Sequence, residues 1–229
     1  MPNVSAALFV AKSLGKSDVN ARSVLDVGSG DFNGSVAPLL KSWKPQKYVG
    51  VDIVPGRGVD LICSAENLVA VFSENSFDIV LSIEMLEHAQ NWQICISNMK
   101  KVCKAGGLLV VTTRSLGYPC HGFPHDFWRF EHDDFAEIFS DFEILNLETD
   151  ATEPGVFVKV RKPLQWQEKD LSNYMLYGIM TNEKSAKLPD SYRKNSYFKR
   201  LRMKQKVKNL SQSGFIKLGK AFSSLLKLR

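Results

Sequence analysis

Residues 24–34 read Val-Leu-Asp-Val-Gly-Ser-Gly-Asp-Phe-Asn-Gly, a short apolar run that breaks into a glycine-rich turn. Such a turn between a strand and a helix lets a ligand approach the backbone and directs free N–H groups at it. Gly28 and Gly30 fit the dinucleotide fingerprint, but Asn33 stands at its third glycine position. Asp26, just before the turn, would repel a pyrophosphate and attract an ammonium or sulfonium group. The turn therefore favours a ligand with a cationic end.

A second acidic residue lies at the spacing that suits a nucleoside. The apolar run Tyr48-Val-Gly-Val ends in Asp52, 22 residues after Gly30. In nucleotide-binding βαβ units, an acid about 20 residues past the glycine turn binds the ribose hydroxyls. Together, the turn, Asp26 and Asp52 predict a nucleoside cofactor that carries a positive charge. S-adenosylmethionine is the common cofactor with both properties.

The stretch from Val24 to about Arg114 resembles the class I S-adenosylmethionine-dependent methyltransferases, in particular the small-molecule branch with a methyltransferase-11-like domain. Four segments carry the resemblance, in order Val24-Leu-Asp-Val-Gly-Ser-Gly30, Val49-Gly-Val-Asp52, Ser64-Ala-Glu-Asn-Leu68 and Phe77-Asp-Ile-Val-Leu-Ser-Ile-Glu-Met-Leu-Glu-His88. Two positions depart from the family pattern, because the family often has glycine where Phe32 stands and aspartate where Ser64 stands.

The resemblance implies a place for each cofactor-binding residue. Asp26 and the turn would face the methionine moiety, Asp52 the ribose and Ala65 with Glu66 the adenine, while residues 82–84 would close the pocket. The complete set of expected cofactor-binding residues is Asp26, Gly28, Ser29, Gly30, Asp52, Ile53, Ala65, Glu66, Ser82 and Glu84.

Alternating strand and helix patterns predict an α/β fold of the Rossmann-like type. The predicted strands are Ser23–Val27, Lys47–Val51, Val59–Cys63, Phe77–Ile83, Gly107–Thr113, Phe142–Glu148 and Val156–Lys162, and the clearest predicted helices are Asn91–Lys104 and Asp133–Ser140. The first of these helices runs into Gly106-Gly107, a plausible glycine C-cap. The last two strands are joined by a Pro-Gly turn, which indicates an antiparallel hairpin. We expect a three-layer sandwich with a mostly parallel seven-stranded sheet.

Charge divides the chain into a methyltransferase domain over residues 1–163 and a basic, largely helical extension over 164–229. The first part carries 15 basic and 20 acidic residues, whereas the second carries 15 and 4. Within 215–226, apolar residues recur at helical spacing with lysines between them. A basic amphipathic helix can lie on an anionic membrane surface, hold RNA phosphates, or pack on its own domain or a second subunit. The pattern leaves the three alternatives open.

The acceptor side is expected in residues 114–130, an aperiodic stretch rich in aromatics that follows the fifth strand. A hydroxyl acceptor must lose a proton when it is methylated, and histidine titrates near the required pH. The candidates for this role are His125, with Asp126 orienting its ring, followed by His88 and His121. In a passive loop, Asp126 would instead pair with Arg129 and the histidines would bind backbone. His121, His125 and Asp126 could also ligate a metal, but no further ligand is evident, so we predict none.

The sequence thus predicts a methyltransferase that O-methylates a hydroxyl of a sugar, glycolipid or other small acceptor. The alternatives are an RNA methyltransferase whose basic tail holds its substrate, and a binding protein that has kept the cofactor fold without chemistry. No signal peptide, spanning apolar run or Cys-x-x-Cys pair is evident. We therefore expect a cytoplasmic chain with reduced cysteines, at the inner membrane face if residues 191–229 bind lipid.

Overall fold

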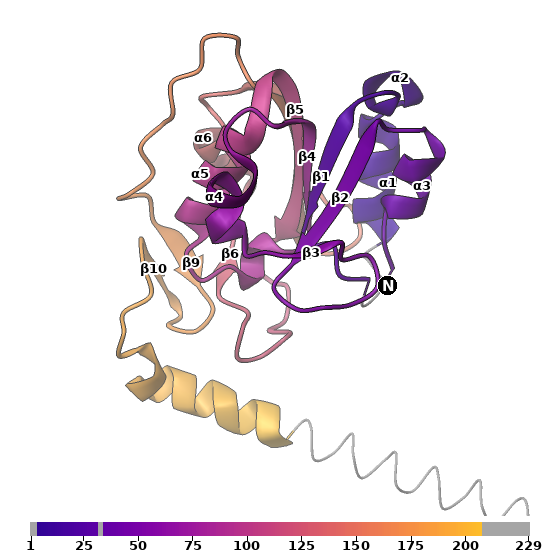
Figure 1. The fold of residues 1–229 in the computed structure, drawn as a ribbon. Helices are drawn as coiled ribbons and strands as arrows, with labels where there is room; N and C mark the ends of the chain where they lie inside the picture. Colours follow the sequence, from indigo (N-terminus) through magenta and orange to yellow (C-terminus); the bar gives the residue numbers. More distant parts are fainter. Residues whose placement is uncertain (1–3, 32–33, 208–229) are drawn as a thin grey trace, which may run out of the picture.

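A seven-stranded sheet in the order β3-β2-β1-β4-β5-β8-β7 forms the centre of the computed structural model, which describes residues 4–31 and 34–207 (Figure 1). Its strands are β1 (Ser23–Val27), β2 (Lys47–Asp52), β3 (Leu61–Ile62), β4 (Phe77–Ile83), β5 (Cys103–Arg114), β7 (Glu143–Thr149) and β8 (Gly155–Arg161). The chain enters the sheet at β1, which pairs in parallel with β2 on one side and β4 on the other. The gap between the turns after β1 and β4 is the switch point at which such sheets bind ligands.

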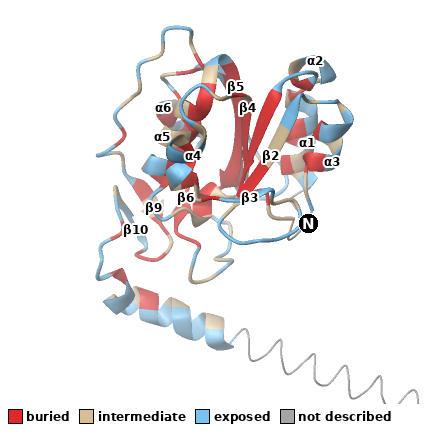
Figure 2. Ribbon diagram, viewed as in Figure 1, coloured by how far each residue is buried: buried red, intermediate tan, exposed pale blue. Residues whose placement is uncertain are grey.

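Helices cover both faces of the sheet. The helices on one face are α1 (Val4–Ser13), α2 (Lys16–Val19) and α3 (Ala37–Ser42), and those on the other are α4 (Leu68–Phe72), α5 (Trp92–Val102) and α6 (His132–Ile138) (Figure 1). Alternate residues of each strand supply the two cores, since Val24 packs under α1 and α3 while Leu25 packs toward α4 and α5. The central strands are buried on both faces (Figure 2). The predicted three-layer fold is confirmed.

The predicted hairpin is also present. Strand β8 is antiparallel to both neighbours, with Val111 opposite Val158 and Leu147 opposite Val158 on the other side. The turn between β7 and β8 contains Pro154, as the sequence indicates. The strand predicted over 59–63 is reduced to Leu61–Ile62.

The end of α5 differs from the sequence prediction. The helix stops at Val102 rather than at a glycine cap, and β5 begins at Cys103. A buried ammonium group does the capping, because Lys162 Nζ donates to the carbonyl oxygens of Lys100 at 2.9 Å and Cys103 at 2.7 Å. A cation near the carbonyl end of a helix is favourable both as a donor and through the helix dipole.

The segment after residue 163 packs against the sheet domain. Strands β9 (Leu176–Gly178) and β10 (Glu183–Ser185) join β6 (Trp128–Arg129) in a small antiparallel sheet. The remaining elements are three short 3₁₀ turns, η1 (Ala65–Asn67), η2 (Leu86–His88) and η3 (Tyr192–Lys194). The last described element is a helix over 196–207. The predicted largely helical character is therefore not confirmed for 164–195.

The predicted amphipathic stripe within 215–226 lies outside the described residues, as do Phe32 and Asn33. The domain boundary at residue 163 stays a prediction. Among the residues that the structure describes, no helix has the length and apolar character that a membrane crossing requires.

Replacing the capping ammonium should lower stability. In Lys162→Met the apolar stem remains but the carbonyls at the end of α5 lose their donor, which should cost about 2–4 kcal/mol of unfolding free energy. Chemical denaturation measures the loss, with exposed Lys12→Met as the matched control. A change in Lys162→Met no larger than in the control would contradict the capping role.

Candidate active site

A cavity of about 570 Å³ opens at the carboxyl ends of β1, β2 and β4. Its wall includes nine of the ten expected cofactor-binding residues, namely Asp26, Gly28, Ser29, Gly30, Asp52, Ile53, Ala65, Glu66 and Glu84. The tenth, Ser82, is fully buried in β4 and does not line the cavity. The residues that the resemblance singles out thus gather around one cavity, while their contacts with a cofactor stay a prediction.

The glycine turn is packed too tightly for a side chain at Gly28. Gly28 has φ of +80°, and a Cβ there would fall 2.6 Å from Met85 Cγ. Ser29 Oγ donates to the carbonyl of Gly58 at 2.9 Å, which ties the turn to the loop after β2. Gly34 also has positive φ and donates its N–H to Asp31 at 2.9 Å. The backbone of the turn thus faces the cavity directly.

Asp26 is a buried carboxylate beside the turn. Tyr48 donates its hydroxyl to Asp26 Oδ2 at 2.6 Å. Burial raises the pKa of Asp26 to about 6, although the Tyr48 bond and the positive charge of Lys41 oppose the rise. Asp26 is still ionised at neutral pH, and it lies where a cationic group in the cavity could neutralise it.

Asp52 and Glu66 lie farther along the cavity wall. Asp52 accepts the backbone N–H of Gly30 at 3.1 Å, so the acid at the end of β2 is bonded directly to the glycine turn. Both carboxylate oxygens of Glu66 accept from the same amide nitrogen, because Asn91 Nδ2 lies 3.2 Å from each of them. Ser64, where the family often has aspartate, accepts the N–H of Glu66 at 3.2 Å. The hydroxyl therefore caps the 3₁₀ turn as a short acid would.

Three carboxyl and imidazole groups follow β4. Glu84 has φ of +55° and forms an ion pair with Arg114. Burial and the neighbouring Glu87 raise the pKa of Glu84, while the positive charge of Arg114 opposes the rise. Glu87 is fully buried and accepts from Thr113 Oγ1 at 2.7 Å. His88 Nδ1 lies 2.5 Å from the backbone carbonyl of His125.

All three candidate histidines line the cavity, but Asp126 does not. Asp126 is fully buried and accepts from Arg129 at 2.6 and 2.8 Å. It also accepts the backbone N–H of His121 at 2.8 Å, and its carboxylate lies 3.1 Å from His121 Nδ1. The expected orientation of His125 by Asp126 is therefore not formed, whereas the Asp126–Arg129 pair of the passive-loop alternative is.

His121 lies between two carboxylates, which fixes its charge. Burial alone would lower its pKa, but Asp126 and Glu87 outweigh burial and raise the pKa to about 9. Burial likewise opposes ionisation of Glu87, yet the His121 and His88 imidazoles and Thr113 lower its pKa. His121 thus holds its proton at neutral pH and is poorly suited to act as a base.

Sequence reasoning missed Tyr118, which lines the cavity, and Glu87, which is buried behind the cavity wall. Tyr118 lies with its ring centroid 4.0 Å from the Arg114 guanidinium carbon and 5.1 Å from the His121 ring. Glu87 stands inside the quoted motif, and its spacing of three from Glu84 and one from His88 is the signal that could have identified it.

Comparison with known proteins agrees with this geometry. The family model described as a methyltransferase domain matches residues 25–111, which span β1 to most of β5. This chain carries a class I S-adenosylmethionine-dependent methyltransferase domain. The predicted family is confirmed, and with it S-adenosylmethionine as the cofactor that the family uses. The acceptor-side residues 114–130 lie beyond the matched span.

Solved structures share the fold at low sequence identity. The 1,6-didemethyltoxoflavin-N1-methyltransferase of Burkholderia thailandensis, crystallised with 1,6-didemethyltoxoflavin and S-adenosylhomocysteine, is 15% identical, with a TM-score of 0.52 over 70% of this chain and 77% of its own. A putative S-adenosylmethionine-dependent methyltransferase from Listeria monocytogenes is 12% identical, with a TM-score of 0.54 over 69% of this chain and 97% of its own. The [4+2]-cyclase SpnF is 16% identical, with a TM-score of 0.55 over 69% of this chain and 80% of its own.

No curated protein matches the sequence significantly. Because a cyclase stands among the similar structures, the shared fold alone leaves the reaction and the acceptor to be argued from the residues of this domain.

Substitution of Asp26 should separate stability from cofactor binding. The folded-state pKa of about 6 exceeds the ordinary 3.8, so the contribution of neutral Asp26 to stability is present at low pH and is lost as pH rises through 6. Asparagine does not ionise, so the Asp26→Asn variant does not lose stability in this way as pH rises. Its unfolding free energy relative to the native chain should rise by roughly 2–3 kcal/mol between about pH 4 and about pH 7.

The same substitution should weaken S-adenosylmethionine binding, because it removes a negative charge from the cavity. Denaturation at several pH values and titration calorimetry provide the two readouts. The exposed Asp133→Asn is the control and should leave both unchanged. A pH-independent stability difference for Asp26→Asn would contradict the assignment of a raised pKa.

Proposed function

We propose that this protein transfers the methyl group of S-adenosylmethionine to a hydroxyl of a sugar, glycolipid or other small acceptor. The observation that supports the proposal best is that one cavity has two chemically distinct walls. Carboxylates and the glycine turn form the donor wall, and imidazoles with Tyr118 form the other. The second wall comes from segments after β4 and β5.

The donor wall suits the cofactor at each end. Ionised Asp26 would attract the cationic methionine end, which the bare backbone of the glycine turn can approach closely. Asp52 would accept from the ribose hydroxyls, as its place at the end of β2 implies. Ala65 and Glu66 would then border the adenine, next to Ile53.

Methyl transfer from a sulfonium is an in-line displacement, in which positioning of the acceptor supplies much of the rate. The acceptor oxygen forms a bond to the methyl carbon, the carbon–sulfur bond breaks, and its electron pair stays on sulfur. The hydroxyl proton must go to a base. Among the described residues, the His125 ring has no hydrogen-bonding partner while it lines the cavity, so we assign the proton to His125.

His125→Ala should lower kcat by about 10²- to 10⁴-fold while the affinity for S-adenosylmethionine stays the same, because the ring acts on the acceptor rather than on the donor. Single-turnover transfer and calorimetry separate the two effects. His132→Ala is the matched control, since His132 is exposed on α6 and does not line the cavity. Full turnover in His125→Ala would place the base elsewhere.

The basic helix over 196–207 supports an acceptor held at an anionic surface. Phe198 is buried and stacks on Phe123 of the acceptor-side segment, with ring centroids 5.5 Å apart. The exposed residues of this helix include no acid and five cations, namely Lys199, Arg200, Arg202, Lys204 and Lys206. We propose that this charge holds the protein on an anionic lipid surface, with RNA as the alternative that the experiment below can detect.

Labelled S-adenosylmethionine and fractionated cell extract should show the label in lipid or saccharide. A variant with glutamine at the five cationic positions should lose retention on anionic vesicles and transfer to vesicle-bound acceptor, while a water-soluble acceptor is methylated as before. These positions are exposed, so the change should leave folding intact. Label confined to RNA would overturn the proposal in favour of the RNA methyltransferase alternative.

A further inference from the structure

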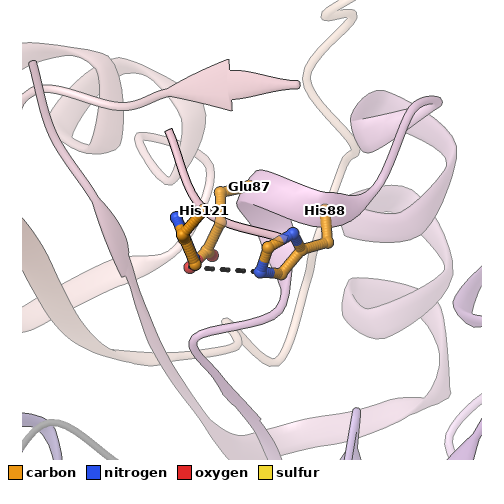
Figure 3. Close-up of side chains that lie close together, drawn as sticks. All are labelled: Glu87, His88 and His121. Carbon is orange, nitrogen blue, oxygen red and sulfur yellow. Dashed lines mark ion pairs between the residues drawn. The ribbon is translucent and has the colours of Figure 1, made fainter. Parts of the chain in front are cut away.

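Three side chains converge on one point at the acceptor wall, where His88 and His121 line the cavity and Glu87 is buried behind them. Glu87 and His88 come from η2, and His121 comes from the segment between β5 and β6 (Figure 3). Glu87 Oε1 lies 3.7 Å from His121 Nε2 and 4.0 Å from His88 Nε2. One ligand atom from each of the three residues can be chosen so that all lie within 4.8 Å of one another.

The Nδ1 atom of each imidazole faces an oxygen atom of the acceptor-side segment. His88 Nδ1 faces the His125 carbonyl at 2.5 Å, and His121 Nδ1 faces the Asp126 carboxylate at 3.1 Å. Their Nε2 atoms are thereby directed to the same side, toward Glu87. Histidines that ligate metals have this arrangement, with one nitrogen held by a carboxylate or carbonyl and the other on the ion.

The carboxylate between them is incompletely satisfied. Glu87 Oε2 accepts from Thr113, but Glu87 Oε1 has no hydrogen-bond partner among the described residues, although the side chain is fully buried. A buried carboxylate oxygen without a partner is costly, and a cation at the point of convergence would satisfy it.

The spacing also suits a metal. Ligands about 2.1 Å from a common ion stand roughly 3.0–3.5 Å apart, so the separations between the three ligand atoms would have to shorten, the widest by no more than about 2 Å. The His88 and His121 side chains are 31% and 35% exposed toward the cavity, which leaves the opposite side of the ion open. Two imidazoles and one carboxylate are a ligand set for divalent first-row transition metals. An ion bound here would displace the proton that His121 otherwise carries toward Glu87.

We propose that Glu87, His88 and His121 bind a divalent transition-metal ion whose open positions receive the acceptor hydroxyl. This reverses the sequence prediction of no metal. It also differs from the alternative set of His121, His125 and Asp126, because Asp126 faces the far nitrogen of His121 and is paired with Arg129. The metal site stands on geometry alone, whereas its role toward the acceptor rests on the proposed function.

Coordination would make the acceptor hydroxyl more acidic without a change in oxidation state. The O–H proton passes to His125, and the oxygen pair forms the bond to the methyl carbon. The carbon–sulfur pair returns to sulfur as that bond breaks, and the neutral thioether leaves. The metal and the base would thus act on the same hydroxyl oxygen of the acceptor.

Cobalt(II) is a suitable probe because its visible spectrum reports nitrogen and oxygen ligands directly. We expect the full chain, stripped of metal with a chelator, to bind one equivalent of Co²⁺ with visible absorption bands. Glu87→Gln and His88→Asn should each weaken this binding by more than about tenfold. His132→Asn, which alters an exposed histidine outside the cluster, should bind Co²⁺ like the native chain.

Folding of each variant is checked by its affinity for S-adenosylhomocysteine, which the substitutions should leave near the native value. Absence of one-equivalent Co²⁺ binding, or native binding by well-folded His88→Asn, would overturn the metal site. Metal binding without methyl transfer to any hydroxyl-bearing fraction would leave the site standing and contradict the proposed function. Full transfer by the stripped chain would remove the metal from the reaction.

Discussion

The close approach of the turn after β1 to the segment after β4 is the constraint on which the site depends. Gly28 lies against Met85 so closely that no Cβ fits between them. The donor turn and the residues 84–88 are thereby held as one packed unit across the switch point of the sheet. A methyl donor and its acceptor must meet within ångströms, and this contact sets the distance between the two walls before either ligand arrives.

The buried acids of the site are balanced in different ways, and each balance suggests a task. Asp26 accepts from the neutral phenol of Tyr48, so a cationic ligand could balance its charge. Glu84 lies against the Arg114 guanidinium, which gives it a structural role. Within residues 4–31 and 34–207, Glu87 is hydrogen-bonded on one oxygen and has no hydrogen-bond partner for the other. The charge of the group beside each acid thus distinguishes candidate binding groups from structural ones more clearly than residue type does.

Local features of the sequence predicted the donor half well. A glycine turn after an apolar run and an acid one strand later are short-range signals, and the cavity confirms their convergence at Asp26 and Asp52. The acceptor half depends on pairings across distant segments, which periodicity does not encode. Asp126 and His125 are adjacent in sequence, yet Asp126 turns inward to Arg129, and Lys162 caps a helix 60 residues earlier. Ser82 is fully buried within β4 and does not line the cavity, so its expected part in closing the pocket stays a prediction.

The stacking of Phe123 on Phe198 has a consequence for how the chain can be shortened. Tyr192 and Phe198 belong to the same buried cluster as the α5 and α6 residues, so the start of the basic segment is part of the folded core. A version of the chain that ends at the charge boundary would remove the Phe198 ring that packs on Phe123 and loosen the segment between β5 and β6. Any minimal catalytic fragment must therefore retain the first turn of the helix that begins at residue 196.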